Sequence, residues 1–299
     1  MEQHHHDHHH EITSLNKAFI IGITLNLAFV VAEFAAGFWY NSLGLLSDAG
    51  HNLGDVASLV LAMLAFRLGK GHPTHSYTYG YKKSTVLVSL LNAVILLVAV
   101  GIIIAESITK LFHPRPVEGD AIAWVAGIGV VVNAVTAWLF MKDKDKDLNV
   151  KGAYLHMAAD ALVSVGVVIS GIVIAHTGWY IIDPVIGLII ALVIIYSTWG
   201  LLRDSLRLSL DGVPAGTDIE KVEKAMHAVE GVQGVHHLHI WAISTTETAL
   251  TAHVSIDDLS DMERIKQEIK HELQHVGIYH ATLEFETSEI KGESLCWPD

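Results

Sequence analysis

The chain has 299 residues, of which 51% are hydrophobic, and its formal net charge is −13. The hydrophobic residues gather in long blocks, which is typical of a protein that spans a lipid bilayer and not of an ordinary soluble domain. The negative charge repels a phosphate backbone and so excludes a nucleic-acid-binding protein, and the single cysteine, Cys296, excludes a disulfide framework within the chain.

Six apolar runs occupy the first two-thirds of the sequence. Each is long enough to cross a hydrocarbon core of roughly 30 Å as a helix. They lie at about residues 17–40, 45–68, 84–111, 119–141, 152–177 and 184–202. Most lysines and arginines of the short loops follow the second, fourth and sixth runs, so the positive-inside rule places both termini in the cytoplasm. We therefore expect a six-helix transmembrane domain over 15–208, preceded by a disordered His-rich cytoplasmic tail over 1–14.

The chain changes character over residues 209–299, which are predicted to form a soluble cytoplasmic domain. Thr217 or Asp218 can cap an amphipathic helix that ends near Gly231. The stretches "VHHLHIWAIS" and "TALTAHVSID" then alternate like paired strands, a second helix covers about 261–276, and "YHATLEFET" alternates again. This αββαβ order predicts an α+β fold of one sheet and two helices.

Two of the apolar runs carry ionisable residues at matched spacing. His51 and Asp55 are four residues apart in the second run, and His156 and Asp160 repeat that spacing in the fifth. On a helix such residues lie one turn apart on one face, so two helices that face each other would assemble two nitrogens and two oxygens, a tetrahedral shell suited to Zn²⁺. One His–Asp pair alone would be as consistent with an interhelical hydrogen bond, but two matched pairs favour metal binding. Asp48, three residues before His51, is expected to support the site without being one of its four ligands.

These motifs resemble a known family. The stretches "SDAGHNLGD", "HMAAD" and "HLHIWAIS" look like those of the cation diffusion facilitator family, and among its members the chain is most similar to cobalt-zinc-cadmium resistance efflux proteins and zinc transporters. The resemblance implies a six-helix membrane bundle with a ferredoxin-like, metallochaperone-like cytoplasmic domain. It also implies a homodimeric secondary transporter that exchanges divalent cations for protons, with His51, Asp55, His156 and Asp160 as its transport site.

The resemblance implies a second metal site in the loop between the second and third runs. His72 and His75 match two members of that site, and a tyrosine stands where some relatives have a further histidine. The alternative is a solvated turn that binds no metal. In that case Lys82 and Lys83 would hold the loop against acidic residues such as Asp211, a contact that the resemblance suggests near a dimer interface.

A third candidate site lies in the cytoplasmic domain. His236 and His239 fall in the first predicted strand, His253 in the second and Glu286 in the third. Neighbouring strands bring alternate residues onto a shared face. The resemblance implies that these four residues bind a regulatory Zn²⁺ that tightens the dimer and couples to transport.

The function expected from the sequence is therefore Zn²⁺/H⁺ exchange, with Cd²⁺ and Co²⁺ as further cargo that the sequence does not rank. A bacterial inner membrane is expected, because the chain has no long His-rich loop and no targeting segment. Two other classes remain open. One is a membrane-anchored metal sensor without transport. The other is an intramembrane zinc hydrolase, which is disfavoured because no H-E-x-x-H motif is expected in the chain and because a closed four-ligand site leaves no position for an activated water.

Overall fold

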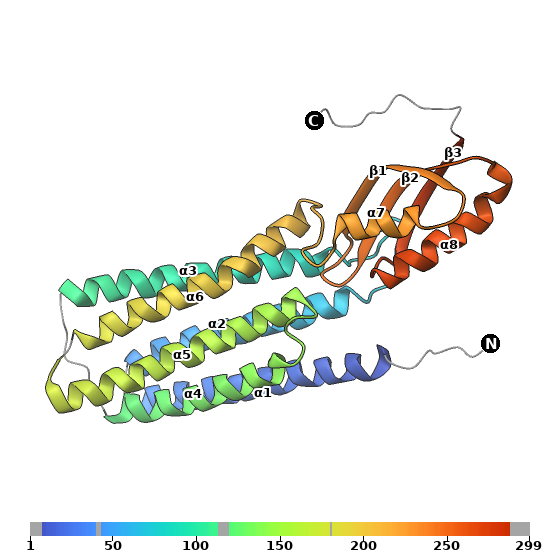
Figure 1. The fold of residues 1–299 in the computed structure, drawn as a ribbon. Coiled ribbons are helices and arrows are strands. Elements are labelled where there is room, and N and C mark those ends of the chain that lie inside the picture. The colour runs from blue at the N-terminus through green and yellow to red at the C-terminus, as the bar shows by residue number, and fades with distance from the viewer. Residues whose placement is uncertain (1–7, 40–42, 113–119, 180, 288–299) are drawn as a thin grey trace. The chain divides into compact units, whose positions relative to one another are not determined.

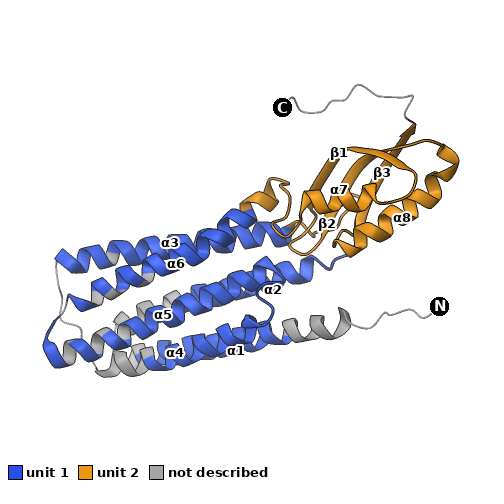
Figure 2. Ribbon diagram, viewed as in Figure 1, with its two compact units in different colours: residues 1–71, 84–205 blue, residues 72–83, 206–299 orange. Residues whose placement is uncertain are grey.

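The computed structural model describes the backbone of residues 8–39, 43–112, 120–179 and 181–287. The chain divides into two compact units, coloured separately in Figure 2. The first comprises residues 1–71 and 84–205, and the second comprises residues 72–83 and 206–299. The loop after the second apolar run therefore groups with the C-terminal part of the chain, because its contacts are with that part.

Long helices build the first unit (Figure 1). They are α1 (His8–Trp39), α2 (Leu43–Leu68), α3 (Ser84–Phe112), α4 (Asp120–Met141), α5 (Leu148–Thr177) and α6 (Ile182–Ser209). Each coincides with one predicted apolar run, although α1 begins inside the predicted tail and residues 1–7 lie outside the described part. Among the described residues, three segments are long and apolar enough to cross a membrane: Lys17–Ala36, Ser84–Phe112 and Gly187–Ser209.

Helices α1 and α4 approach closely because small and aromatic side chains line their contact. Phe19 and Phe140 are fully buried, with ring centroids 4.9 Å apart. Gly22 lies against Thr136, where an added Cβ would come within 3.0 Å of the threonine methyl carbon. Asn26 donates from its amide to Thr136 Oγ1 over 3.0 Å, so a polar bond inside the bundle adds to close packing.

Helices α2 and α5 share the same buried cluster. Leu59 of α2 and Met157 of α5 are almost completely buried, and Ala62 and Ala153 keep the two backbones close. Leu59 is four residues after Asp55, and Met157 is next to His156. The packing of these apolar residues therefore brings the ionisable residues of α2 close to those of α5.

The second unit has the predicted αββαβ order (Figure 1). Its elements are α7 (Ile219–His227), β1 (Val232–Ala242), β2 (Thr248–Ile256), α8 (Met262–His275) and β3 (His280–Thr287). The sheet order is β1-β2-β3, with β1 and β2 antiparallel and β2 and β3 parallel. Asp218 is the N-cap residue of α7, and its side chain accepts a hydrogen bond from the Lys221 backbone N–H.

Helices α7 and α8 cover one face of this sheet, and among the described residues no helix covers the other, which we call the uncovered face. Ile265, Ile269 and Leu273 repeat every four residues along α8 and pack with Leu250 and Val254 of β2 in one buried core that also includes α7. Successive strand residues point to opposite faces. The residues between the core positions of β2 therefore project from the uncovered face. His253, the candidate ligand on β2, is one of them.

Candidate functional site

The first unit contains a buried group of three ionisable side chains. Asp55 projects from α2, and His156 and Asp160 project from consecutive turns of α5. His156 Nε2 lies 2.8 Å from Asp55 Oδ1 and 3.7 Å from Asp160 Oδ2. Asp55 is 3% exposed and His156 is 7% exposed. One ligand atom from each residue lies within 4.8 Å of the others, so a single metal ion could contact all three.

Two other sequence candidates belong to α2 as well. His51 belongs to α2, one helical turn before Asp55, but its side chain lies outside the described part of the structure, as does that of Asp48. Between His51 and Asp55, the Asn52 amide donates to Glu33 Oε2 of α1 over 2.6 Å. Both partners are buried, so this bond fixes the rotation of α2 about its axis next to the site.

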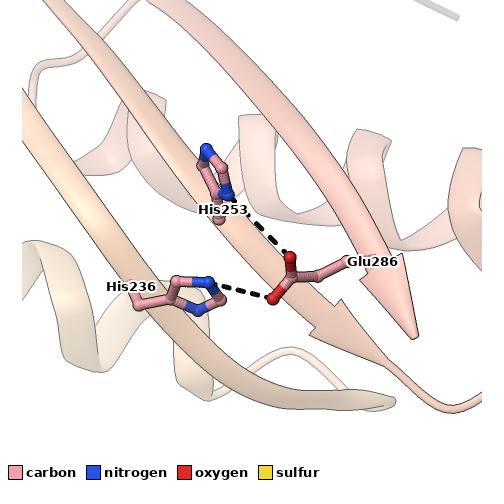
Figure 3. Close-up of side chains that lie close together, drawn as sticks. All are labelled: His236, His253 and Glu286. Carbon is pink, nitrogen blue, oxygen red and sulfur yellow. Dashed lines mark ion pairs between the residues drawn. The ribbon is translucent and has the colours of Figure 1, made fainter. Parts of the chain in front are cut away.

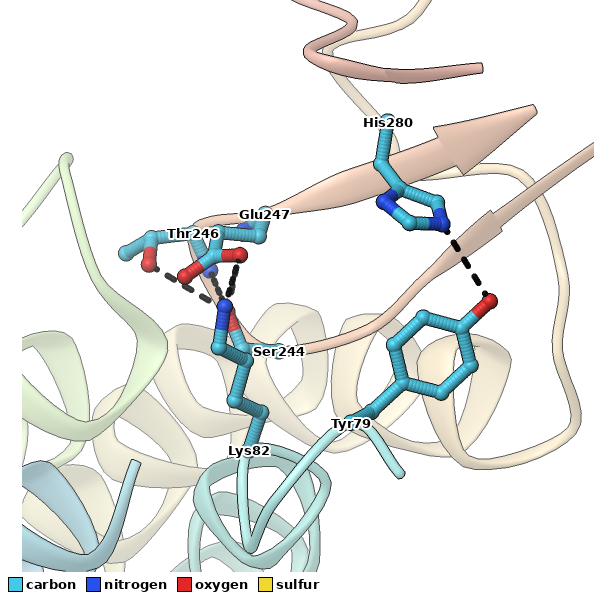
Figure 4. Close-up of polar contacts among 6 residues, drawn as sticks. All are labelled: Tyr79, Lys82, Ser244, Thr246, Glu247 and His280. Atoms are coloured by element: carbon cyan, nitrogen blue, oxygen red, sulfur yellow. Dashed lines mark hydrogen bonds and ion pairs between the residues drawn. The ribbon is translucent and has the colours of Figure 1, made fainter. Parts of the chain in front are cut away.

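The loop histidines have a different environment. His72 and His75 are exposed, and neither belongs to a group of three metal-ligating side chains among the residues that the structure describes. Tyr79 Oη lies 3.4 Å from His280 Nε2 at the start of β3, and the two rings meet edge to face (Figure 4). The tyrosine at this position thus contacts the C-terminal part of the chain.

The two lysines of the loop make the predicted kind of contact with acidic residues. Lys83 Nζ donates to Asp211 Oδ1 over 2.6 Å, and also to the carbonyl oxygens of Leu208 at 2.8 Å and Ala242 at 3.1 Å. Lys82 Nζ forms an ion pair with Glu247 Oε2 at 2.5 Å (Figure 4). These bonds tie the loop to the end of α6 and to the β1–β2 hairpin, all within the second unit.

A second group of ligand atoms lies on the uncovered face of the sheet (Figure 3). His236 of β1 is directly opposite His253 of β2. A carboxylate oxygen of Glu286 on β3 lies 2.9 Å from His236 Nε2, and the other lies 3.9 Å from His253 Nδ1. Ser255 also donates to Glu286 over 3.1 Å. The three strands thus bring two imidazoles and one carboxylate within reach of one ion.

An irregularity in β1 decides how the remaining histidines lie. The register with β2 shifts between His236 and His239, and His237 adopts a positive φ of 48°. The ring of His237 stacks on His253, with centroids 4.9 Å apart. His239 pairs with Thr251, so it is on the same face as His236 but outside the three-residue group. The sequence pattern could not show how the ring of His237 lies, because the bulge has no local signal.

A third group lies on α8 and was also missed. His271, Glu272 and His275 are solvent-facing, and their ligand atoms lie within 4.8 Å of one another. The stretch "HELQH" at 271–275 has the H-E-x-x-H spacing of zinc metalloproteases. The expectation that the chain has no such motif was therefore wrong, and the motif is the signal that could have found this group. It belongs to α8 of the second unit and not to an apolar helix, and therefore does not support the intramembrane hydrolase.

Two family models match this chain. Residues 19–208 match the model described as the cation efflux transmembrane domain. Residues 214–287 match the model described as the cytoplasmic domain of cation efflux proteins. Together the two matches cover most of the chain and coincide with its apolar helices and its mixed sheet.

Several curated proteins are similar over nearly their whole length. A "cadmium, cobalt and zinc/H(+)-K(+) antiporter" from Bacillus subtilis (strain 168) is 35% identical, covering 97% of this chain and 96% of the relative. "Zinc transporter ZitB" from Escherichia coli (strain K12) is 35% identical, covering 92% and 88%. "Cation efflux system protein CzcD" from Alcaligenes sp. (strain CT14) is 35% identical, covering 89% and 85%.

Proposed function

The chain belongs to the cation efflux family, and on that premise we propose that it moves Zn²⁺ out of the cytoplasm in exchange for protons. Membership of this family and its transporter-named relatives make it a divalent metal cation transporter and not an enzyme. The names of the relatives support zinc, cadmium and cobalt as cargo and protons as the exchanged ion.

The observation that carries the proposal is the buried meeting of Asp55, His156 and Asp160 between α2 and α5. His51 is proposed as the fourth ligand, because it is one turn from Asp55 on the same helix face. Imidazole nitrogens favour zinc-like ions over Mg²⁺ or Ca²⁺, and carboxylates in place of thiolates keep the ion exchangeable. Ionisable groups at membrane depth are costly, so a cluster of them indicates an ion pathway.

The same geometry suggests how protons and metal exchange. The 2.8 Å contact between His156 Nε2 and Asp55 Oδ1 is a hydrogen bond, which requires one proton between two atoms that would both bind the metal. A metal ion can therefore enter only when that proton leaves, and the proton returns when the metal is released. Alternating exposure of the site to the two sides of the membrane converts this competition into exchange.

The membrane arrangement is also part of the proposal. We place all six long helices, α1 to α6, across a bacterial inner membrane with both termini in the cytoplasm, because three of them already meet the length and hydropathy of a span. The second unit is then a cytoplasmic domain of ferredoxin-like type, supported by its αββαβ order. A match to the cytoplasmic domain of cation efflux proteins supports a homodimer.

The ligands on the sheet, His236, His253 and Glu286, which we call the sheet group, support a regulatory role for zinc. His236, His253 and Glu286 are proposed to bind Zn²⁺ in the cytoplasm and so to tighten the dimer, with His239 nearby on the same face. For His72 and His75, exposure and the absence of a third nearby ligand among the described residues favour the alternative of a loop held by Lys82 and Lys83.

Zn²⁺ flux into sealed vesicles that contain the purified protein tests the proposal. With a pH gradient imposed, the unaltered protein should accumulate Zn²⁺, and Asp55→Ala or Asp160→Ala should abolish accumulation. Asp143→Asn is the matched control, because it removes a carboxylate that pairs with Lys146 outside the site. Zn²⁺ binding without flux in the unaltered protein would instead indicate a membrane-anchored sensor.

A further inference from the structure

The solvent-facing side of α8 presents two imidazoles one helical turn apart. The rings of His271 and His275 meet edge to face, with centroids 4.6 Å apart. His271 Nδ1 lies 3.5 Å from Glu272 Oε1, and the side chain of His271 is 68% exposed. Both histidines are thus accessible to solvent and already close together on a regular helix.

This arrangement has the geometry of a chelate. Residues i and i+4 lie on one helix face, so the rotamers of the two imidazoles can direct one nitrogen each at a common point. The third ligand atom comes from Glu272, and all three atoms lie within 4.8 Å of one another. Two nitrogens and one oxygen are donors that Zn²⁺, Co²⁺, Ni²⁺ and Cu²⁺ accept.

We propose that His271, Glu272 and His275 form a metal site on the outer face of α8 that takes a divalent transition-metal ion directly from the cytoplasm. The inference is independent of the transport site and goes beyond the proposed function. Because the site is exposed and supplies three protein ligands, water completes its coordination and the bound ion exchanges readily. The cytoplasmic unit then carries an accessible holding site for ions of the same class as the cargo.

The α8 site is separate from the sheet group. Ile269 and Leu273 of α8 face the buried core, and His271 and His275 face away from it. The group of His236, His253 and Glu286 lies on the opposite, uncovered face of the sheet. A zinc ion bound to one group therefore does not use the ligands of the other.

The H-E-x-x-H spacing does not make α8 a peptidase. In metalloproteases the two histidines hold zinc, the glutamate between them acts on a water, and a further ligand comes from another element. Here Glu272 itself contacts His271. Among the described residues, no metal-ligating side chain from another element joins this group. The geometry therefore supports metal binding and not hydrolysis.

Helix α7 provides a natural control. His227 and Glu223 are also four residues apart and exposed, with His227 Nε2 3.9 Å from Glu223 Oε1. That pair offers one imidazole in place of two and belongs to no three-ligand group among the described residues. His227 should therefore stay free of metal at concentrations that fill the α8 site.

The test is residue-by-residue labelling of histidines in the full chain with diethyl pyrocarbonate, read by peptide mass spectrometry at buffered free Zn²⁺. At a free Zn²⁺ concentration ten times the dissociation constant, about one site in eleven is empty, so labelling of His271 and His275 should slow about tenfold. His227 should label at the metal-free rate. Peptide-level readout separates this site from the His-rich N-terminal stretch.

Variants make the chelate itself falsifiable. His275→Ala should restore fast labelling of His271 at the same free Zn²⁺, whereas Gln274→Ala, on the same turn, should keep His271 protected. Asp55→Ala should lose Zn²⁺ flux and still protect His271, which separates this inference from the transport proposal. The inference is overturned if zinc leaves both labelling rates unchanged, or if His271 stays protected in His275→Ala.

Discussion

A single contact, between His156 and Asp55, carries most of the chemistry proposed for the transport site. The two side chains come from different helices, are almost fully buried and lie 2.8 Å apart. A buried polar contact of this kind is costly unless every partner is satisfied. When no metal is bound, the proton in this hydrogen bond gives both buried atoms a partner. When a metal ion is bound, the ion would take the place of that proton.

At this scale we predict that Asp55→Asn preserves the fold but removes metal binding. The amide is nearly the same size and can still hydrogen-bond His156, but it carries no charge to hold a cation. Loss of an outer contact to a ligand lowers metal affinity up to about 100-fold, so loss of a direct ligand should cost at least that. Zn²⁺ titration of the purified protein measures this change.

Asn26→Ala is the control for that variant. It removes a buried amide that bonds Thr136 between α1 and α4. Its thermal unfolding temperature should fall while its zinc affinity stays unchanged. Equal zinc affinities for Asp55→Asn and the unaltered protein would show that Asp55 is not a ligand.

At the scale of helices and strands, the sequence predicted the type and order of the elements well. The i, i+4 spacing placed His156 and Asp160 on one face of α5, and alternation placed His253 on a polar face of β2. That α2 and α5 face each other could not be predicted, because it depends on packing between residues such as Leu59 and Met157.

The β1 bulge is the clearest limit on prediction from sequence. In a regular strand, residues three apart point to opposite faces, so His236 and His239 would be separated. The left-handed conformation of His237 shifts the register and puts both on one face. The surrounding sheet holds His237 in this unfavourable backbone conformation, and no local sequence pattern predicts it.

The loop contacts give a second prediction. Lys83 donates to one carboxylate and two backbone carbonyls. Hydrogen bonds from a charged donor contribute about 1.5–3 kcal/mol. Lys83→Ala should therefore lower the unfolding free energy of the cytoplasmic unit by about that amount.

Thermal unfolding of Lys83→Ala and of the unaltered protein, together with the rate of proteolysis within residues 72–83, measures this difference. Faster cleavage of the loop in Lys83→Ala is expected, because the loop loses its attachment to Leu208 and Ala242. An unfolding temperature and a cleavage rate equal to those of the unaltered protein would contradict the assignment of Lys83 as an attachment of the loop.

At the scale of the whole molecule, the proposed function combines metal transport by one unit with metal sensing by the other. The chain passes between the two units at residues 71/72, 83/84 and 205/206. The strongly acidic composition attracts cations toward the protein. A zinc ion that binds the folded cytoplasmic unit and not its unfolded chain must stabilise that unit.

We predict that zinc raises, and a chelator lowers, the unfolding temperature of the cytoplasmic unit. At a free Zn²⁺ concentration 100 times the dissociation constant, the stabilisation should be about 2.7 kcal/mol. His253→Ala should remove the part of this effect that His236, His253 and Glu286 supply, because it removes one of these three ligands. His239→Ala should retain it, since His239 lies outside the group. If His239→Ala lost the stabilisation by zinc and His253→Ala retained it, His239 and not His253 would be the ligand.

The central claim is that metal and proton compete for the same atoms, and coupled flux tests it most directly. Vesicles that contain the protein and a pH-sensitive dye receive a pulse of Zn²⁺ with no imposed pH gradient. We predict that protons move opposite to Zn²⁺ in the unaltered protein and that both movements stop in Asp55→Ala. Zn²⁺ entry at an undiminished rate with no change in vesicle pH would contradict the account.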